Sequence, residues 1–402
     1  MENIISEGIL RIKGGVINSQ ISNRLAELKR QNKPIISLNI GEPDFNTYPL
    51  VSYEAIKAIT DNDTHYPPMT GKVGLKDAII KKMYRDYEIN YEHNQVLVCS
   101  GAKQAIFNLF MTILNPGDEV ILFKPYWFSY SSIIEFIGAK VILIDCNEDF
   151  SINLEDFEQK VTNKTKLVVI NSPNNPSGYI YSKEEYNTIA NVVRNNNKIS
   201  VLTDDIYEYI VYDNETCTHF LDANKDLINR TYLVNGVSKA YAMTGWRVGY
   251  IVSANTEVML KMAQFHVNSS GAVCTISQRA AIFALNEVSK ESLKQNNDVF
   301  QYRRDLVVNR LNQIKGMSIY KPPGAFYLLP NCSAFIDKKT RKGKIIKNDV
   351  DFVMYLLEDY YVGVAPATIF GLPNHFRISY ATSKDNLTIA CDRIEKAVLA
   401  LL

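Results

Sequence analysis

Short apolar runs alternate with helical patterns through residues 95–255, and this alternation is the first indication of the fold. Several of the runs are rich in β-branched residues, and several end in a small or polar residue before a turn. They cover residues 96–99, 120–123, 141–144, 167–170, 200–203 and 232–235. Strands that alternate with helices are typical of βαβ units. We therefore expect an α/β fold with a mostly parallel central sheet flanked by helices.

The uncharged segment 104–117 carries apolar side chains at Ile106, Leu109, Phe110 and Ile113. Their i, i+3, i+4, i+7 spacing predicts an amphipathic helix that packs on the core. The segment is too short to cross a bilayer, because a membrane span needs about 20 apolar residues.

The pattern changes after about residue 290. A long charged helical pattern covers residues 289–313, and short strands and helices follow it to the C-terminus. We expect a large domain over residues 46–290 and a smaller α+β domain over residues 291–402. Residues 1–45 are expected to pack with the smaller domain.

The balance of charges excludes some classes of function. The 402 residues include 44 Lys and Arg against 43 Asp and Glu, for a formal net charge of +1. This balance gives no basic surface for nucleic acid or for an anionic membrane. The six cysteines form no C-x-x-C pair and the five histidines are scattered, so we expect neither a disulfide framework nor a metal site. Free thiols and an N-terminus without a long apolar region favour a cytoplasmic protein.

Polar residues that follow the predicted strands are the first candidates for chemistry, because such sheets bind ligands at the carboxyl ends of their strands. Lys239 follows the run at 232–235 and lies among small and apolar residues. Such surroundings lower the pKa of a lysine and free its amine to attack a carbonyl. Arg247 comes eight residues later and has the forked geometry that binds phosphate. Taken alone, each residue has a more ordinary interpretation, as a solvated lysine and as the partner of a core carboxylate.

Asp204, Asp205 and Tyr207 follow the run at 200–203. Adjacent side chains on a strand point to opposite faces, so only one of the two aspartates can face a given site. A buried carboxylate needs a cationic partner, and the protonated pyridine nitrogen of a cofactor would be one. Tyr207 could hydrogen-bond a phenolic oxygen. The simpler alternative is an aspartate that caps a helix, followed by a packed tyrosine.

Four further positions have candidate roles. Asn175 precedes a proline, which favours an extended backbone and could aim its amide at a ligand. The turn at 100–103 opens the predicted helix and would present free N–H groups to a phosphate. Trp127 could stack on an aromatic ring or simply fill the core. Arg377 lies in an apolar strand pattern and needs a carboxylate from the protein or from a substrate.

In combination, these residues resemble class I/II aminotransferases, which are fold-type I pyridoxal-phosphate (PLP) enzymes, and most closely their bacterial aspartate aminotransferase branch. The resemblance runs from about residue 25 to the C-terminus. The segments that carry it, in the family's order, are 41–45 (GEPDF), Tyr66, 100–103 (SGAK), 125–127 (PYW), 175–178 (NPSG), 204–207 (DDIY), 238–239 (SK), 243–247 (MTGWR) and Arg377.

The resemblance implies a role for each residue near the cofactor ring. Lys239 holds the cofactor through a Schiff base and moves a proton during catalysis. Asp204 pairs with the ring nitrogen, Tyr207 and Asn175 contact a ring oxygen, and Trp127 stacks on the ring.

It also implies how the phosphate is held. The backbone of Ala102 and Lys103 would bind the phosphate together with Arg247. Tyr66 would reach it from the partner subunit, so the active site would need a homodimer.

The substrate would be an L-amino acid that exchanges its amino group with a 2-oxoacid. Arg377, with Gly41 and Asn175, would bind the α-carboxylate beside Trp127. Lys103 would meet a distal carboxylate, which favours aspartate and 2-oxoglutarate; its alternative is a lysine held by backbone carbonyls.

Three positions depart from the family pattern. Gly236 replaces a hydroxyl residue, Asp205 replaces a glutamate, and Ala367 replaces a glycine. Another PLP reaction on the same fold is therefore the alternative function: β-elimination, racemisation, decarboxylation or oxygen-dependent oxidation of an amino acid. A PLP-sensing regulator is not favoured. Such proteins usually carry a DNA-binding module before this fold, whereas here the resemblance already begins at about residue 25 and the charge balance gives no basic surface.

Overall fold

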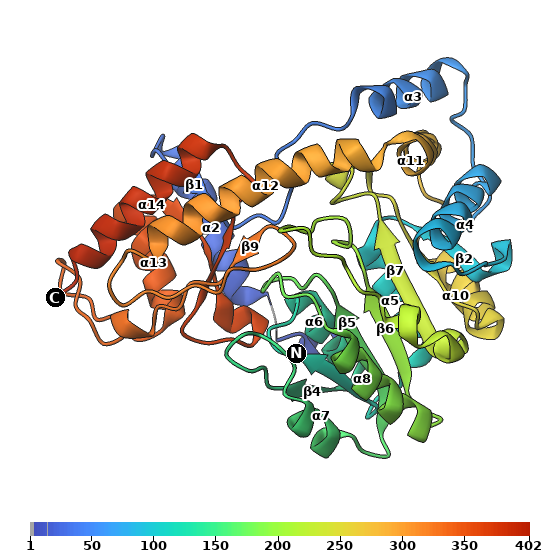
Figure 1. The fold of residues 1–402 in the computed structure, drawn as a ribbon, viewed down its shortest axis with the longest axis horizontal. Coiled ribbons are helices and arrows are strands. Elements are labelled where there is room, and N and C mark those ends of the chain that lie inside the picture. The colour runs from blue at the N-terminus through green and yellow to red at the C-terminus, as the bar shows by residue number, and fades with distance from the viewer. Residues whose placement is uncertain (1–3, 14) are drawn as a thin grey trace.

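The computed structural model describes residues 4–13 and 15–402, and a seven-stranded sheet forms its centre (Figure 1). The strands, in spatial order, are β2 (Val96–Cys99), β8 (Gly249–Val252), β7 (Thr231–Gly236), β6 (Ser200–Asp204), β5 (Thr165–Asn171), β3 (Glu119–Phe123) and β4 (Lys140–Ile144). All six predicted runs form strands of this sheet, and β3 to β7 pair in parallel. The seventh strand, β8, was not predicted, and it pairs antiparallel with both β2 and β7.

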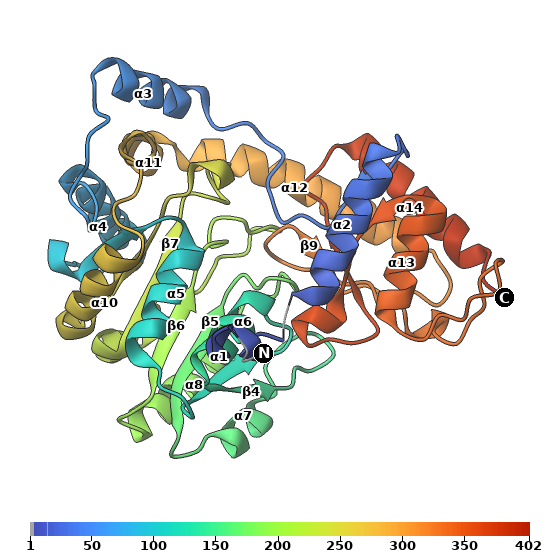
Figure 2. The same ribbon diagram turned by 180° about the vertical axis from the view of Figure 1, so that it is seen from behind.

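Both faces of the sheet are buried under helices (Figures 1 and 2). One core includes Val96 and Val98 and is covered by α4 (Val73–Tyr87), α8 (Lys183–Asn195) and α11 (Thr275–Glu287). The alternate strand residues Leu97 and Cys99 belong to a second core under α5 (Ala102–Ile113), α6 (Phe128–Ile137) and α10 (Thr256–Ser269). Strands that are buried on both faces explain the continuous apolar runs in the sequence.

Helix α5 confirms the amphipathic pattern at 104–117 but occupies residues 102–113. It begins directly after Gly101, whose φ of 86° suits a glycine. It ends before Pro116, because a proline disfavours helical backbone at the residue before it.

A separate core joins the N-terminal segment to the C-terminal part of the chain. Its helices are α2 (Val16–Arg30), α12 (Lys290–Leu311), α13 (Asp349–Tyr360) and α14 (Lys384–Leu399). Its strands are β1 (Ile36–Ser37), β9 (Tyr327–Leu328), β10 (Val362–Gly363), β11 (Ala365–Pro366) and β12 (Phe376–Ser379). They form one parallel pair, β1–β10, and one antiparallel sheet in the order β11-β12-β9. The side chain of Arg24 on α2 donates to both carboxylate oxygens of Glu358 on α13, at 2.5 and 2.7 Å.

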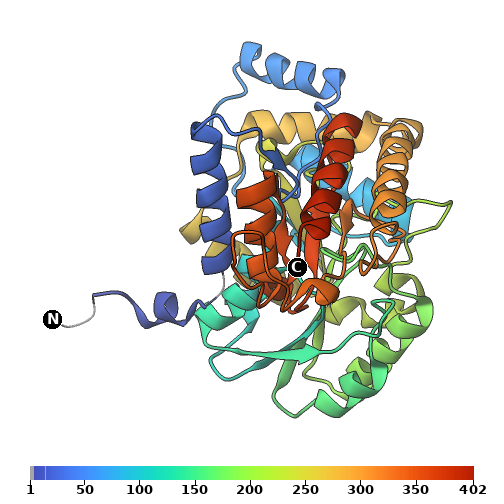
Figure 3. The same cartoon turned by 90° about the vertical axis from the view of Figure 1, so that its left-hand side faces the viewer.

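Helix α2 stands beside α13, as Figure 3 shows in blue and orange. The short helix α1 (Glu7–Arg11) packs instead against α6. The division into domains at residues 46 and 291 stays a prediction.

The remaining short elements complete the fold. They are the α-helices α3 (Pro49–Thr60), α7 (Leu154–Lys160) and α9 (Phe220–Ala223), and the 3₁₀ helices His93–Gln95, Lys225–Arg230, Thr244–Trp246, Ser333–Phe335 and Ala367–Phe370. Among the described helices, none is both long and apolar enough to span a membrane.

Candidate active site

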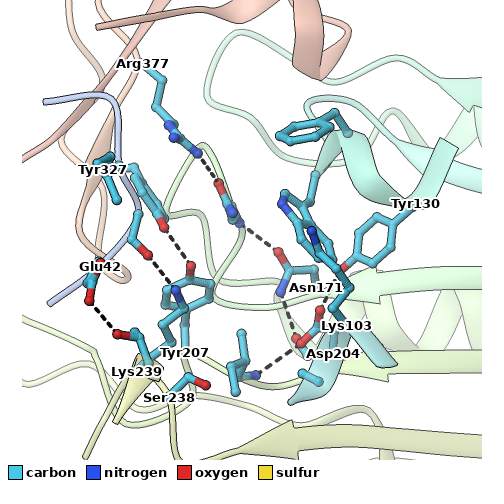
Figure 4. Close-up of a pocket in the computed structure, with 18 of the residues that line it drawn as sticks. Glu42, Lys103, Tyr130, Asn171, Asp204, Tyr207, Ser238, Lys239, Tyr327 and Arg377 are labelled. Carbon is cyan, nitrogen blue, oxygen red and sulfur yellow. Dashed lines mark hydrogen bonds between the residues drawn. The ribbon is translucent and has the colours of Figure 1, made fainter. Parts of the chain in front are cut away.

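A cavity of about 380 Å³ lies where the carboxyl ends of the parallel strands face the core that joins the N-terminal segment to the C-terminal part of the chain (Figure 4). The predicted residues that line it are Gly41, Ala102, Lys103, Trp127, Asn175, Asp204, Tyr207, Lys239, Arg247 and Arg377. Residues that were not predicted also line it: Ile40, Glu42, Phe128, Tyr130, Asn171, Ile206, Ser238, Thr244 and Tyr327. Tyr66 is absent from this cavity and is 92% exposed. The structure thus brings together every predicted site residue except Tyr66.

Lys239 follows strand β7 and projects into the cavity. Its Nζ donates to the carbonyl oxygen of Gly41 at 2.5 Å. Burial, and after it the nearby charge of Arg377, lower the pKa of this amine to about 8. A lysine with this pKa is much more often neutral near pH 7 than a solvated lysine, so it can serve as a nucleophile and as a base. A Cβ at Gly41 would collide with the hydroxyl of Tyr327, so a larger residue here would displace that tyrosine.

Asp204 is the last residue of β6, and its carboxylate faces the cavity. Its Oδ2 accepts from the hydroxyl of Tyr130 at 2.6 Å, and its Oδ1 accepts from the backbone N–H of Ile206 at 3.4 Å. Burial raises the pKa of this carboxyl to about 6. Within the described chain, Asp204 forms no ion pair, so this buried carboxylate still lacks a cation.

Asp205 points to the other side of the strand, as the alternation predicted. It accepts hydrogen bonds from Tyr87 at 2.9 Å and from His219 at 3.3 Å. Glu208 accepts from Tyr87 at 2.6 Å and lies 2.6 Å from the ammonium of Lys82. Asp205, Glu208 and His219 have the side-chain types and the proximity to ligate a metal ion, but both carboxylates already have these partners. No helix begins at these aspartates, so the capping interpretation was wrong.

Asparagine side chains connect the strand ends to Arg377. Asn171 ends β5, donates to the backbone oxygen of Asp204 at 2.8 Å and accepts from the N–H of Asn175 at 2.7 Å. The amide oxygen of Asn175 then accepts from Arg377 at 3.1 Å. Because this oxygen is engaged, the amide NH₂ of Asn175 remains to donate to a ligand.

Four cations that line the cavity form no ion pair within the described chain. Lys103, Lys239, Arg247 and Arg377 form no ion pair with any described carboxylate. Arg377 is buried and stacks between the rings of Tyr327 and Phe370, at 4.6 and 4.8 Å from their centroids. A buried charge such as that of Arg377 is normally paired, and Lys103 and Arg247 are exposed cations on the same cavity, so the cavity is suited to receive anions.

One end of the cavity suits a phosphate. The N-cap of α5 is Gly101, which has no side chain to cap the helix. The N–H groups of Ala102 and Lys103 make no hydrogen bond within the described chain. Arg247 lies beside them, and its guanidinium donates to the carbonyl oxygens of Thr244 and Ser100 at 2.8 and 3.3 Å. A free helix N-terminus with an arginine beside it is a suitable phosphate site.

These features fit the cofactor that the resemblance implies. The turn at α5 and Arg247 provide for a phosphate, Asp204 lacks the cation that a ring nitrogen supplies, and the amine of Lys239 is poised for an aldehyde. The model of aminotransferase class I and II matches residues 33–394. This chain belongs to that family. The chain is therefore a PLP-dependent aminotransferase, which transfers an amino group between an amino acid and a 2-oxoacid.

Individual relatives place this aminotransferase in the aspartate aminotransferase branch. An aspartate aminotransferase of Rhizobium meliloti is 44% identical over 380 residues, which are 94% of this chain and 92% of the relative. A probable aspartate/prephenate aminotransferase of Rickettsia conorii is 42% identical over 98% of both chains. The crystal structure of the Rhizobium meliloti aspartate aminotransferase covers both chains fully with a TM-score of 0.95 and 42% identity. The Thermus thermophilus aspartate aminotransferase with maleate has a TM-score of 0.90 and 33% identity, covering 99% of this chain and 100% of that one.

The departure from the family pattern at Gly236 has a packing cause. A Cβ at this position would lie 2.8 Å from the backbone oxygen of Val248 and 2.9 Å from the Cα of Gly249 on the paired strand β8. No hydroxyl side chain fits there unless the strands separate. The turn at α5 and Arg247 are thus the groups on this side that remain for a phosphate.

Tyr130 and Tyr327 are the tyrosines of the cavity that the sequence analysis missed. Tyr130 comes three residues after Trp127, and this helical spacing was a usable signal because it places both rings on one face of α6. Tyr327 hydrogen-bonds the hydroxyl of Tyr207 at 2.7 Å. Tyr207 and Tyr327 are 120 positions apart, and no local pattern connects them.

Proposed function

We propose that this aminotransferase uses a dicarboxylic L-amino acid, aspartate or glutamate, as its amino donor. The observation that carries the proposal is Lys103, a cation that lines the cavity and forms no ion pair with a carboxylate of the described residues. The phosphate and the α-carboxylate account for Arg247 and Arg377. Lys103 is then left for a second substrate carboxylate.

The surroundings of Lys103 support this role. Its Nζ lies 5.0 Å from the centroid of the Trp127 ring. Burial lowers the pKa of Lys103, and the charge of Arg247 lowers it further. Both effects disfavour the charged ammonium, so a carboxylate bound there would relieve an electrostatic cost. The Rhizobium meliloti relative is named for aspartate, and the Thermus thermophilus structure contains the dicarboxylate maleate.

The side chains of the cavity divide the work of the transfer. Arg377 orients the α-carboxylate with its planar fork, and Lys239 takes the proton from the substrate Cα and would deliver it to C4′ of the cofactor. Asp204 stays ionised beside the position of the ring nitrogen. PLP, when bound, supplies the electron sink that stabilises the carbanion.

The test is a single-turnover reaction of the purified holoenzyme with L-aspartate, L-glutamate and L-alanine in turn. We expect the two dicarboxylic acids to remove the visible absorbance of the lysine-bound cofactor at low concentration, and 2-oxoglutarate to restore it. Alanine should need a far higher concentration. If alanine reacts as readily as aspartate, the proposed donor class is wrong.

Lys103→Met is expected to lower kcat/KM for aspartate by about tenfold to a hundredfold, because one charge-assisted contact to the distal carboxylate is lost. The value for alanine should change by less than about twofold, because alanine has no distal carboxylate. An equal loss for both substrates would indicate that Lys103 acts on the cofactor phosphate instead. Steady-state kinetics with both amino acids separate these outcomes.

Prephenate is a second candidate acceptor, favoured by the Rickettsia conorii relative and its printed name. Prephenate is also a 2-oxoacid with a second carboxylate, so it makes the same demand on Lys103. The measurement is kcat/KM for prephenate with aspartate as the donor. A value within about tenfold of that for 2-oxoglutarate would support the dual activity, and absence of turnover would exclude it.

We also propose that the enzyme is a homodimer in which Tyr66 reaches the phosphate site of the partner subunit. Tyr66 lies on a segment anchored at both ends by an ion pair between Asp63 and Lys72. The hydroxyl of Thr275 adds a hydrogen bond to the backbone of Asp63 at 2.6 Å. Helix α3, nearby in sequence, exposes four apolar side chains, Leu50, Tyr53, Ile56 and Ile59. An exposed apolar face of this kind suits a subunit interface.

A heterodimer of a Tyr66→Phe subunit and a Lys239→Ala subunit tests this arrangement. One of its two sites would combine Lys239 from the first chain with Tyr66 from the second, and this site should behave as wild type. We therefore expect about half of the wild-type activity per dimer and one tightly bound cofactor. If Tyr66 acts within its own subunit, no site of the heterodimer is complete, and the activity should not exceed that of the Tyr66→Phe homodimer.

A further inference from the structure

The hydroxyl of Tyr130 is the principal partner of the carboxylate in the active site. It lies 2.6 Å from Oδ2 of Asp204, and both side chains are buried, with 2% and 4% exposure (Figure 4). Within the described chain, no other side chain donates a hydrogen bond to this carboxylate; the remaining contact is the long one from the backbone of Ile206. A short hydrogen bond to a charged group is roughly twice as strong as a neutral one.

Helix α6 fixes the direction of this hydroxyl. Trp127 is the N-cap of the helix and Tyr130 lies in its first turn. The two rings meet edge to face, with centroids 5.2 Å apart and planes at 88°. Tyr130 also belongs to the buried core that includes Ile134, one turn further along the helix. One helical turn therefore presents both the predicted stacking ring and the donor to Asp204.

In this pair Tyr130 is the hydrogen-bond donor and the Asp204 carboxylate is the acceptor. Burial raises the pKa of the Asp204 carboxyl, and the neighbouring charge of Asp205 adds to this effect. The hydrogen bond from Tyr130 and the charge of Lys239 oppose it by favouring the carboxylate. Burial raises the pKa of the Tyr130 phenol well above its usual value, so Tyr130 stays protonated and acts as the donor.

We propose that Tyr130 is a positioning residue that keeps the Asp204 carboxylate ionised and directed at the ring nitrogen of the cofactor. The inference rests on the proposed role of Asp204. On the protein side, the group that supports the Asp204 carboxylate is then the neutral hydroxyl of Tyr130, and not a second charged side chain. Trp127 and Tyr130 then act together: Trp127 restrains the cofactor ring, and Tyr130 restrains the Asp204 carboxylate that pairs with its nitrogen.

The test measures the Kd for PLP of the Tyr130→Phe apoprotein and of the wild-type apoprotein by equilibrium dialysis. The variant removes the hydroxyl and keeps the ring. We expect the Kd for PLP to rise about tenfold, because a hydrogen bond to a charged group is lost. On acidification, the loss of affinity should begin about one pH unit higher, because Asp204 is protonated more readily without its donor. Tyr126→Phe is the matched control, because its hydroxyl lies near Ser131 and not near Asp204, and it should bind PLP as wild type does.

A double-mutant cycle with Asp204→Asn distinguishes positioning from a general structural effect. Tyr130→Phe should have little further effect on Kd in the Asp204→Asn background, since the carboxylate it serves is gone. Additive effects, or a Tyr130→Phe variant with wild-type Kd and wild-type pH dependence, would overturn the proposal. If Asp204→Asn itself leaves Kd unchanged, the proposed role of Asp204 fails as well. Should Tyr130→Phe not fold, Tyr130→His supplies another donor in its place. A wild-type pH dependence of Kd in that variant supports the proposal, and a Kd as high and as independent of pH as that of Asp204→Asn overturns it.

Discussion

Replacing Lys239 with alanine is expected to lower kcat for amino transfer by at least about four orders of magnitude. General acid–base catalysis by a positioned side chain contributes about 10² to 10⁴, and Lys239 is also the candidate nucleophile for the cofactor. Within the cavity, no other described lysine combines a pKa lowered to about 8 with contact to Gly41. The measurements are steady-state kinetics and the visible spectrum after reconstitution with PLP.

Borohydride reduction followed by mass spectrometry of the peptides identifies the attached lysine directly. Wild type should carry the cofactor on Lys239, and Lys239→Ala should carry none. Lys76→Met is the control, because Lys76 is also a buried lysine with a lowered pKa but donates to Thr70 and His93 outside the cavity. This control should retain the covalent cofactor. Attachment at Lys103 in wild type would contradict the assignment.

The strands and their order along the chain could be predicted because each is an apolar run, and all of them except β4 are buried on both faces. Strand β8 was missed because its local signal is weak. It begins at Gly249, two residues after Arg247 with its αL backbone, and it lies antiparallel between β2 and β7. Its pairing with β7 and with the distant β2 identifies it.

The site residues at strand ends could be predicted for a topological reason. Parallel strands bring their carboxyl ends to one edge, so Asp204 and Lys239 meet although 35 positions separate them. The alternation along a strand also decided correctly that Asp204 and Asp205 face opposite sides. The hydrogen bonds among these residues could not be predicted. The contact from Tyr130 to Asp204 depends on how α6 packs on the sheet, and that packing is set by the whole core.

The charged side chains that line the cavity are mostly positive. Within the described residues that line it, four cations face only Asp204 and Glu42. Glu42 accepts from the hydroxyl of Thr244 at 2.6 Å and favours the charged form of Lys239. The excess of positive charge matches a phosphate together with one or two carboxylates. An apoprotein with this excess should bind anions before it binds neutral ligands.

Replacing Arg377 with alanine is expected to raise the KM for the amino acid about a hundredfold or more, while PLP stays bound. Arg377 donates to the side chain of Asn175 at 3.1 Å and to the backbone oxygen of Asn39 at 2.7 Å. These two contacts fix the guanidinium, and its Nε has no hydrogen-bond partner within the described chain. A carboxylate that docks on this fork gains charge-assisted hydrogen bonds, and their loss accounts for the expected change.

Arg377→Lys separates charge from geometry in this prediction. The lysine retains a positive charge but lacks the planar fork, so KM should lie between those of wild type and Arg377→Ala. The Kd for PLP should remain within about twofold of wild type in both variants, because Arg377 lies apart from the turn at α5 and from Arg247. An unchanged KM in Arg377→Ala, or a loss of PLP equal to the loss of substrate binding, would show that this arginine does not recognise the α-carboxylate.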